Sequence, residues 1–163
     1  MIQKVRKGEE LDEVNIKKYL YKNQFITDKN SELIIEQFSN GFSNLTYLLK
    51  IEKKELVLRC PPNGAVKYGH DMSREFKVLK GLNKGFEKAP KAHLFTNDID
   101  IIGAPFYIME KIEGIILSKK EANNRNICAE DYQKIACNWL DTFVELHELD
   151  YKKMGLEDLG KPN

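Results

Sequence analysis

The stretch LIIEQFSNGFSNLTYLLKIEKKELVLRC, residues 33–60, decides the fold that this sequence predicts. It contains three apolar runs, at residues 33–38, 45–51 and 55–60. An Asn-Gly pair between two apolar runs is a strong hairpin signal, and here it separates the first two runs. Pro61-Pro62 ends the third run, because proline cannot donate a ladder hydrogen bond. The stretch therefore predicts a three-stranded antiparallel meander.

Helical and extended patterns continue on both sides of the meander. Residues 11–22 carry an apolar stripe at helical spacing. Downstream, Asp71 begins a second helix, in which apolar residues recur at steps of three and four, and residues 92–95 and 105–110 are apolar enough for two more strands. We therefore expect an α+β lobe, with a five-stranded antiparallel sheet and one helix between its third and fourth strands.

The pattern changes after Gly114. Residues 130–149 have a regular apolar stripe with a period of 3.6 residues, which predicts a long amphipathic helix. The tail that follows is polar and Gly-rich, and we expect no closing element in it.

Composition excludes several classes of protein. A net charge of +1 on 163 residues makes nucleic acid an improbable partner. No apolar run approaches the ~20 residues that span a bilayer, and residues 1–10 lack the apolar core of a signal peptide. The three cysteines have no CxxC spacing and the three histidines lie far apart, so we expect no disulfide or metal site and a cytoplasmic protein.

Five short strings, in this order, resemble the aminoglycoside phosphotransferase family, whose fold is choline-kinase-like and protein-kinase-like. They are QFSNGFSNLTY (37–47), LVLR (56–59), REF (74–76), GAPFYIMEKIEG (103–114) and LHELD (146–150). They are most similar to the branch found beside or fused to acyl-CoA dehydrogenases. The resemblance implies a nucleotide-binding N-terminal lobe at residues 1–110. Residues 111–163 would be the hinge and the first long helix of a truncated helical C-terminal lobe.

The resemblance gives the hairpin tip a role. It implies that backbone N–H groups of this loop cover the phosphates of ATP. The residues concerned are Ser39, Asn40, Gly41, Phe42 and Ser43. With a single glycine, the loop does not match GxGxxG, and taken alone it favours an ordinary tight turn.

The third strand of the meander ends in a cation. Val57 and Arg59 share one face of this strand. In protein kinases a lysine at this place contacts the α- and β-phosphates. The resemblance therefore implies that Arg59 contacts phosphate and that Val57 covers the adenine, although arginine replaces the usual lysine. The alternative is an arginine that simply ends a strand in water.

Glu75 lies on the apolar side of the helix that starts at Asp71. A buried carboxylate is costly unless it is paired, and the resemblance supplies the pair Arg59–Glu75. A local pair with Arg74 or Lys80, or an exposed position, is the alternative.

The hinge that the resemblance implies is residues 109–112. Its backbone would read the adenine edge through the carbonyl of Glu110 and the N–H of Ile112, while Met109 would shape the rear of the pocket. The alternative is an edge strand followed by a loop.

Two other pairs of polar residues could suggest a metal site or acid–base catalysis, but each has a simpler structural explanation. Asp98 and Asp100 lie in a turn between strands, where such residues serve backbone geometry. His147 and Asp150 lie at a helix end, without a nucleophile nearby.

The sequence lacks the HGD…N loop and the later aspartate that the family uses for transfer. We therefore expect an ATP-dependent phosphotransferase that acts on a small-molecule hydroxyl. This chain would be a fragment of it that is inactive alone. We expect Mg²⁺ to bind only when the missing C-terminal lobe is present. The alternatives are a degenerate, non-enzymatic module that binds nucleotide or protein, and an unrelated α+β binding domain. Helix 130–149 would lack most of its packing partners, and two chains could dimerise through it.

Overall fold

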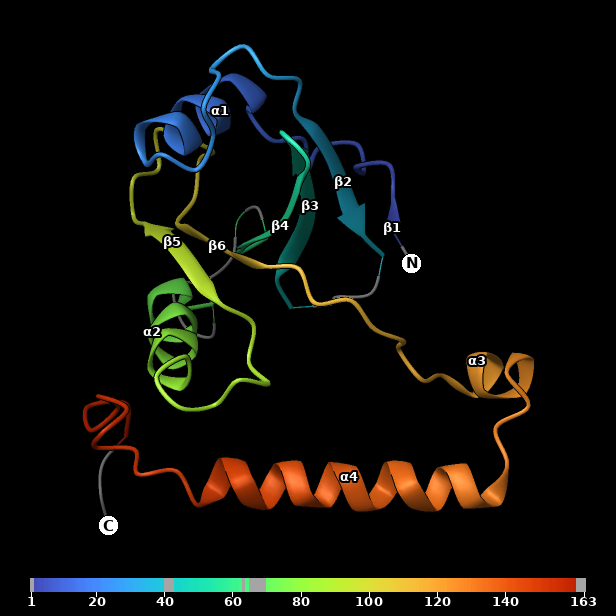
Figure 1. Ribbon diagram of the computed structural model, residues 1–163. Coiled ribbons are helices and arrows are strands. Elements are labelled where there is room, and N and C mark those ends of the chain that lie inside the picture. Colours follow the sequence, from blue (N-terminus) through green and yellow to red (C-terminus); the bar gives the residue numbers. More distant parts are fainter. Residues whose placement is uncertain (1, 40–42, 63, 65–69, 161–163) are drawn as a thin grey trace.

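The computed structural model describes residues 2–39, 43–62, 64 and 70–160, and their arrangement is shown in Figure 1. These residues form an antiparallel sheet of six strands in the order β1-β2-β3-β4-β6-β5. The strands are β1 (Ile2–Gln3), β2 (Ile34–Phe38), β3 (Leu45–Ile51), β4 (Lys54–Cys60), β5 (Ala92–Thr96) and β6 (Phe106–Glu110). The helices are α1 (Glu13–Lys22), α2 (Met72–Leu82), α3 (Lys119–Asn124) and α4 (Ala129–His147).

The predicted meander, α2 and the long helix α4 are confirmed, but the predicted strand number was wrong. The additional strand, β1, pairs Ile2 with Phe38 and Gln3 with Gln37 at the free edge of β2. A strand of two residues has no periodic pattern of its own, so only the edge of β2 determines it. Helix α3 was also missed, although Ser118 and Glu121 have capping-box spacing and the Ser118 hydroxyl accepts the N–H of Glu121 at 3.1 Å.

The two faces of the sheet have different partners. Residues that are paired across strands lie on the same face. One face packs against α1, where Ile16 and Leu20 are fully buried, and forms the main core with Tyr47, Leu58 and Phe106. The opposite face packs against α2, whose Phe76 ring stacks on Phe95 at 5.5 Å.

Helix α2 is fixed at both ends. The Asp71 carboxylate accepts the N–H groups of Ser73 and Arg74, and the Ser73 hydroxyl bond is the main cause of the lowered pKa of Asp71. Near its other end, a side chain at Gly81 would come within 2.6 Å of Leu156. The tail, for which we expected no closing element, therefore packs against α2.

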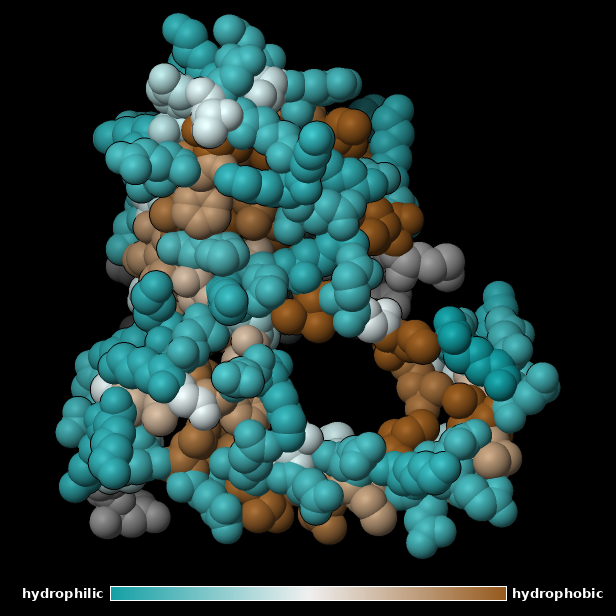
Figure 2. Space-filling model, in the orientation of Figure 1, coloured by the Kyte–Doolittle hydropathy of each residue, from teal (hydrophilic) through white to brown (hydrophobic). Residues whose placement is uncertain are grey.

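Helix α4 is separate from the sheet. Figure 2 shows an open space between α4 and the layer formed by the sheet and α2. Its apolar stripe is exposed, with Trp139 at 65% and Leu140 at 54%. Among the described residues, no helix has the length and apolar character needed to cross a membrane.

The turn between β3 and β4 makes a testable contribution to stability. The Glu52 carboxylate accepts N–H bonds from Thr27 at 2.9 Å and Asp28 at 2.7 Å, and it also accepts the Ser31 hydroxyl. These bonds, chiefly that of Asp28, lower the pKa of Glu52 to about 2.

Because this pKa is lower in the folded than in the unfolded state, the ionised carboxylate stabilises the fold above pH ~4.5. The stabilisation is lost as pH falls toward 2. We expect Glu52→Gln to be less stable than wild type at pH 7, and the difference to shrink between pH 4.5 and 2. Urea unfolding across this range measures it, and a constant difference would contradict the assignment.

Candidate functional site

The Glu75 carboxylate joins three elements on the α2 face of the sheet. Its Oε1 accepts the side-chain amide N–H of Asn44 at 2.7 Å, and its Oε2 accepts the Tyr107 hydroxyl at 2.9 Å. The Arg59 guanidinium lies 3.5 Å from the same Oε2. The predicted Arg59–Glu75 ion pair is therefore present, within a larger network that ties α2 to β4 and β6.

Asn44 and His70 extend this network to the start of β3. The Asn44 side chain is buried, and its Oδ1 lies 2.7 Å from Nδ1 of His70. Because Nδ2 of Asn44 donates to Glu75, Oδ1 faces the imidazole and can only accept. Nδ1 of His70 must therefore carry the proton. These bonds fix the end of the β2–β3 hairpin relative to α2.

Tyr107 supplies the third bond to Glu75. Its side chain is almost fully buried, and burial followed by the nearby carboxylate charge raises the pKa of its phenol. The hydroxyl therefore stays protonated and serves as a donor. Its ring lies beside that of Phe76 at 6.2 Å, so the same side chain packs against α2 and orients the carboxylate.

Arg59 has unused hydrogen-bonding capacity. The side chain is 31% exposed, but Nε is buried and has no hydrogen-bond partner among the described residues. A buried donor without a partner costs about 1–3 kcal/mol. The ion pair with Glu75 holds the guanidinium in place, and the exposed part of the side chain faces the pocket.

A pocket of about 400 Å³ lies beside this ion pair. It is lined by Arg59, Arg74, Glu75, Val78, Leu79, Pro90, Tyr107 and Met109. Val57 and Met109 are paired across β4 and β6 and lie on the same face as Arg59. The surface thus combines a cation with apolar side chains, an arrangement suited to a ligand with both anionic and apolar parts.

The predicted hinge residues lie at the end of β6. Met109 lines the pocket, whereas the N–H of Glu110 donates to the carbonyl of Lys91 at 2.9 Å. Ile112 follows the strand and is 57% exposed. The structure brings Met109 together with Val57 and Arg59, and a role of Glu110 and Ile112 in reading an adenine edge stays a prediction.

The predicted phosphate-covering loop is only partly described. Asn40, Gly41 and Phe42 lie outside the described residues. Ser39 directly follows β2, and Ser43 precedes Asn44. The structure therefore describes only the first and last residues of this loop, which adjoin β2 and Asn44.

Asp98 and His147, from the two polar pairs considered in the sequence, make only local contacts among the bonds described here. Asp98 accepts the N–H of Asp100 at 3.0 Å, which is a turn interaction. His147 contacts the carbonyl of Phe143 at 2.8 Å within its own helix. Across the described part of the chain, no group of three His, Cys, Asp or Glu side chains could hold a metal ion.

Sequence reasoning missed Asn44, His70 and Tyr107 as members of the site. Tyr107 could have been found, because strand alternation places it on the face of Met109 and its hydroxyl is unusual in so apolar a run. Asn44 and His70 are 26 residues apart. No local pattern joins them.

Comparison with known proteins decides the family. The sequence model of the phosphotransferase enzyme family matches residues 34–163. The chain belongs to the phosphotransferase enzyme family. Residues 2–33 of this phosphotransferase-family chain, which include β1 and α1, lie outside the match.

The relatives confirm the expected branch. Acyl-CoA dehydrogenase family member 11 of Rattus norvegicus is 32% identical over 137 residues, which are 83% of this chain and 17% of that protein. Member 10 of Mus musculus is 30% identical over 163 residues, covering 96% of this chain and 14% of that protein. This phosphotransferase-family chain thus spans less than a fifth of the length of these relatives.

A solved structure agrees. The crystal structure of a Ralstonia eutropha protein assigned as an aminoglycoside phosphotransferase has a TM-score of 0.74 and 25% identity. The similarity covers 94% of this chain and 43% of that one. The kinase-like α+β fold of the phosphotransferase family is therefore confirmed here, with six strands in place of five.

Proposed function

We propose that this chain binds ATP and forms the nucleotide-binding part of a phosphotransferase that acts on a small-molecule hydroxyl. The observation that carries the proposal is Arg59, a partly exposed cation that is held beside Glu75 and lines the pocket together with apolar side chains. The accessible N–H groups of its guanidinium would donate to a phosphate oxygen. Guanidinium groups also match the geometry of phosphate.

The apolar side of the pocket suits the base. Met109 lines the pocket next to Arg59, Val57 is paired with Met109 across β4 and β6, and the backbone of Glu110 and Ile112 follows Met109 along the chain. In this proposal Ser39 and Ser43 belong to the loop over the phosphates. ATP supplies the phosphoryl group, and the residues named here bind and orient it.

Nucleotide binding and transfer are separable in this chain. Transfer requires an aspartate near the acceptor hydroxyl and acidic ligands for Mg²⁺, and the 163 residues contain no HGD…N motif. We propose that these residues alone bind nucleotide without turning it over. Phosphoryl transfer in a single-turnover assay with Mg-ATP would overturn this part of the proposal.

The substrate class and the location are also proposed. The relatives are acyl-CoA dehydrogenase family members. This favours a hydroxy-acyl or similar metabolite as the substrate over an antibiotic. We place the protein in the cytoplasm, where thiols such as those of Cys60, Cys128 and Cys137 stay reduced.

A thermal-shift experiment tests the proposal. A ligand that binds only the folded state stabilises it by about 2.7 kcal/mol at 100 times its Kd. We expect ATP to raise the Tm of the chain, and adenosine to raise it less because it makes no contact with Arg59. The absence of any shift at millimolar ATP would overturn the proposal.

A non-enzymatic, kinase-like binding module is the second candidate. The arginine at position 59, in place of the usual lysine, favours it. An assay in which this chain is joined to the C-terminal lobe of a family member distinguishes the two candidates. Restored phosphoryl transfer supports the enzyme, and ATP binding without transfer supports the module.

We also expect the isolated chain to dimerise through α4. Its apolar stripe is exposed at Trp139, Leu140 and Phe143, and an exposed apolar patch that runs along a helix marks a protein–protein contact surface. Trp139→Lys should weaken the dimer at least ~10-fold, because a charge replaces its most exposed apolar group. Sedimentation velocity over a concentration series measures it.

The matched control is Asn138→Lys, which adds the same charge outside the apolar stripe. A wild-type chain that stays monomeric at 100 times its assay concentration would contradict this expectation. If Trp139→Lys and Asn138→Lys weakened the dimer equally, the interface would lie outside the apolar stripe of α4.

A further inference from the structure

The tail that follows α4, residues 150–160, folds back onto α2 (Figure 1). It is a series of turns, in which the N–H of Leu156 donates to the carbonyl of Tyr151 at 2.9 Å. Gly155 has a φ of 74°, a left-handed conformation that favours glycine. We call residues 154–159 the clip, because the contacts with α2 that follow come from them.

The apolar part of the clip packs where α2 has no side chain. Gly81 is buried in the last turn of α2, and a Cβ placed on it would come within 2.6 Å of the Leu156 side chain and 3.0 Å of the Met154 carbonyl. Glycine within a helix is less stable than alanine. What this position gains from glycine is the close approach of the clip.

Two polar contacts continue the clip along the same face of α2. Lys77 forms an ion pair with Asp158, and Nη2 of Arg74 donates to the carbonyl of Leu159 at 3.1 Å. Arg74, Lys77 and Gly81 are spaced by three and four residues, so they lie on one side of the helix. The clip therefore contacts α2 from its first turn to its last.

This face of α2 adjoins the pocket. Arg74 and its neighbour Glu75 both line the pocket, and Glu75 pairs with Arg59 at 3.5 Å. Described contacts thus lead from the clip to the pocket in two ways. Leu159 holds Arg74 directly, and α2 as a whole carries Glu75 to Arg59.

We propose that the clip positions α2, and through it Arg74 and Glu75, so that the charged side of the pocket is in place before the ligand binds. Leu156 is then a positioning residue. The inference rests on the proposed ATP-binding function. A site that is already ordered loses less conformational freedom on binding. Loosening the clip should weaken contacts to phosphate more than contacts to the base, because Val57 and Met109 lie on strands and not on α2.

The test compares ATP and adenosine binding to the full chain with Leu156→Ala. This change removes the side chain that packs on Gly81 and leaves every residue of the pocket lining intact. We expect ATP to bind about fivefold more weakly, as for mutations that act through a packed network, and adenosine to bind as to wild type. Leu156→Met keeps an apolar side chain of similar volume and should restore most of the ATP affinity.

Gly81→Ala tests the same contact from the α2 side. Its methyl group would collide with Leu156, so it should weaken ATP binding by itself. In the double variant with Leu156→Ala the methyl group occupies part of the vacated space, and the two losses should not add. Additive losses would contradict the contact. Should Leu156→Ala fail to fold, Asp158→Asn breaks the exposed ion pair with Lys77 and is expected to shift the same ratio about twofold.

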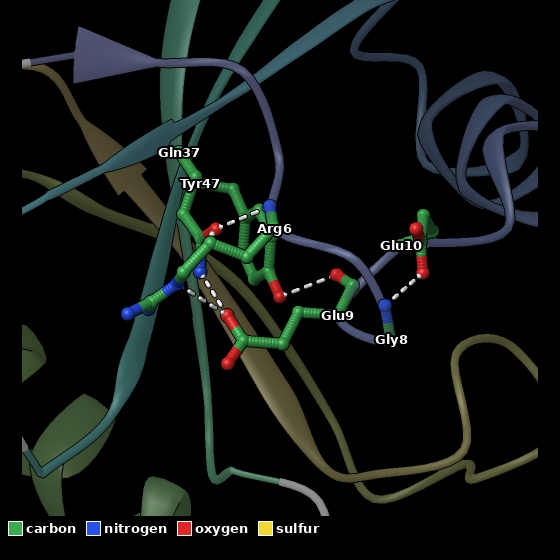
Figure 3. Close-up of polar contacts among 6 residues, drawn as sticks. All are labelled: Arg6, Gly8, Glu9, Glu10, Gln37 and Tyr47. Carbon is green, nitrogen blue, oxygen red and sulfur yellow. Dashed lines mark hydrogen bonds and ion pairs between the residues drawn. The ribbon is translucent and has the colours of Figure 1, made fainter.

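Glu9→Ala is the matched control, because it removes a buried contact elsewhere on the sheet. The Glu9 carboxylate accepts Nε2 of the buried Gln37 at 2.5 Å and pairs with Arg6 at 2.9 Å, and its carbonyl accepts the Tyr47 hydroxyl at 2.7 Å. Figure 3 shows these four residues, the Gln37 cluster. Among the described residues, the hydrogen bonds of the cluster run to β2 and β3 and not to α2. Glu9→Ala should lower the Tm and leave the ratio of ATP to adenosine affinity unchanged.

Hydrogen exchange at the amides of residues 78–82 separates this inference from the proposed function. We expect faster exchange in Leu156→Ala than in wild type or Glu9→Ala. If wild type bound no ATP, the proposed function would fail, and this exchange would still decide whether the clip holds α2. Unchanged exchange would overturn that role. Equal weakening of ATP and adenosine in Leu156→Ala, or no weakening of either, would overturn the effect on the pocket.

Discussion

Replacing Arg59 by alanine is expected to weaken ATP binding about 100-fold, which corresponds to ~2.7 kcal/mol. Hydrogen bonds to charged groups contribute ~1.5–3 kcal/mol each, and Arg59 is the cation that faces the pocket from β4. Adenosine binding should change little, because Val57 and Met109 remain in place. Arg59→Lys should be intermediate, since a point charge replaces a planar fork of donors.

Calorimetric titration with ATP, ADP and adenosine measures these affinities. Arg125→Ala is the matched control, because Arg125 also pairs with a glutamate, Glu121 at 2.6 Å, but on α3. Exposed pairs of this kind contribute only ~0–1 kcal/mol. A loss of ATP affinity shared by both variants would show that net charge, not the position of Arg59, determines binding.

The strands and α2 could be predicted because their signals are local. The alternation along residues 45–51 and 54–60 fixes which side chains share a face, and this alone placed Arg59 beside Val57. The helical spacing of α2 then placed Glu75 on the inward side. The Arg59–Glu75 pair needed these two local patterns together with the resemblance to the family, which supplied the partner.

The polar network could not be predicted because no local pattern encodes it. In the sequence, Asn44 is indistinguishable from an ordinary turn residue. Only the packing of β3 and α2 brings its amide to Glu75. The Gln37 cluster is harder still, since a buried glutamine in a strand has no sequence signal and its partners Arg6 and Glu9 lie about 30 residues earlier. Such contacts depend on the tertiary fold.

The network also explains why α2 can tolerate an inward carboxylate. Glu75 is 34% exposed and has three partners, so its charge is neither isolated nor fully desolvated. Two of these partners, Asn44 and Tyr107, are neutral donors. The Arg59 guanidinium pairs with Glu75 at 3.5 Å and is 31% exposed, which leaves part of it accessible to an anion.

The second large effect concerns stability. Phe106 is fully buried at the start of β6, and its ring meets that of Tyr19 edge to face at 5.3 Å. Tyr19 also donates its hydroxyl to the carbonyl of Phe95 at 3.2 Å. We expect Phe106→Ala to lower the free energy of unfolding by about 3–5 kcal/mol, the range for deleting a buried aromatic ring.

Phe143 provides the matched control, because it is the same residue type at 45% exposure on α4. Phe143→Ala should cost less than ~1 kcal/mol, since surface substitutions rarely cost more. Urea unfolding of both variants measures the difference. Because domains of this size have only ~5–15 kcal/mol of stability, Phe106→Ala would approach the unfolding limit, and α1 would be the first helix to lose its packing. Equal losses in the two variants would contradict the assignment of the core to the α1 face of the sheet, since α4 would then contribute as much to stability as β6 does.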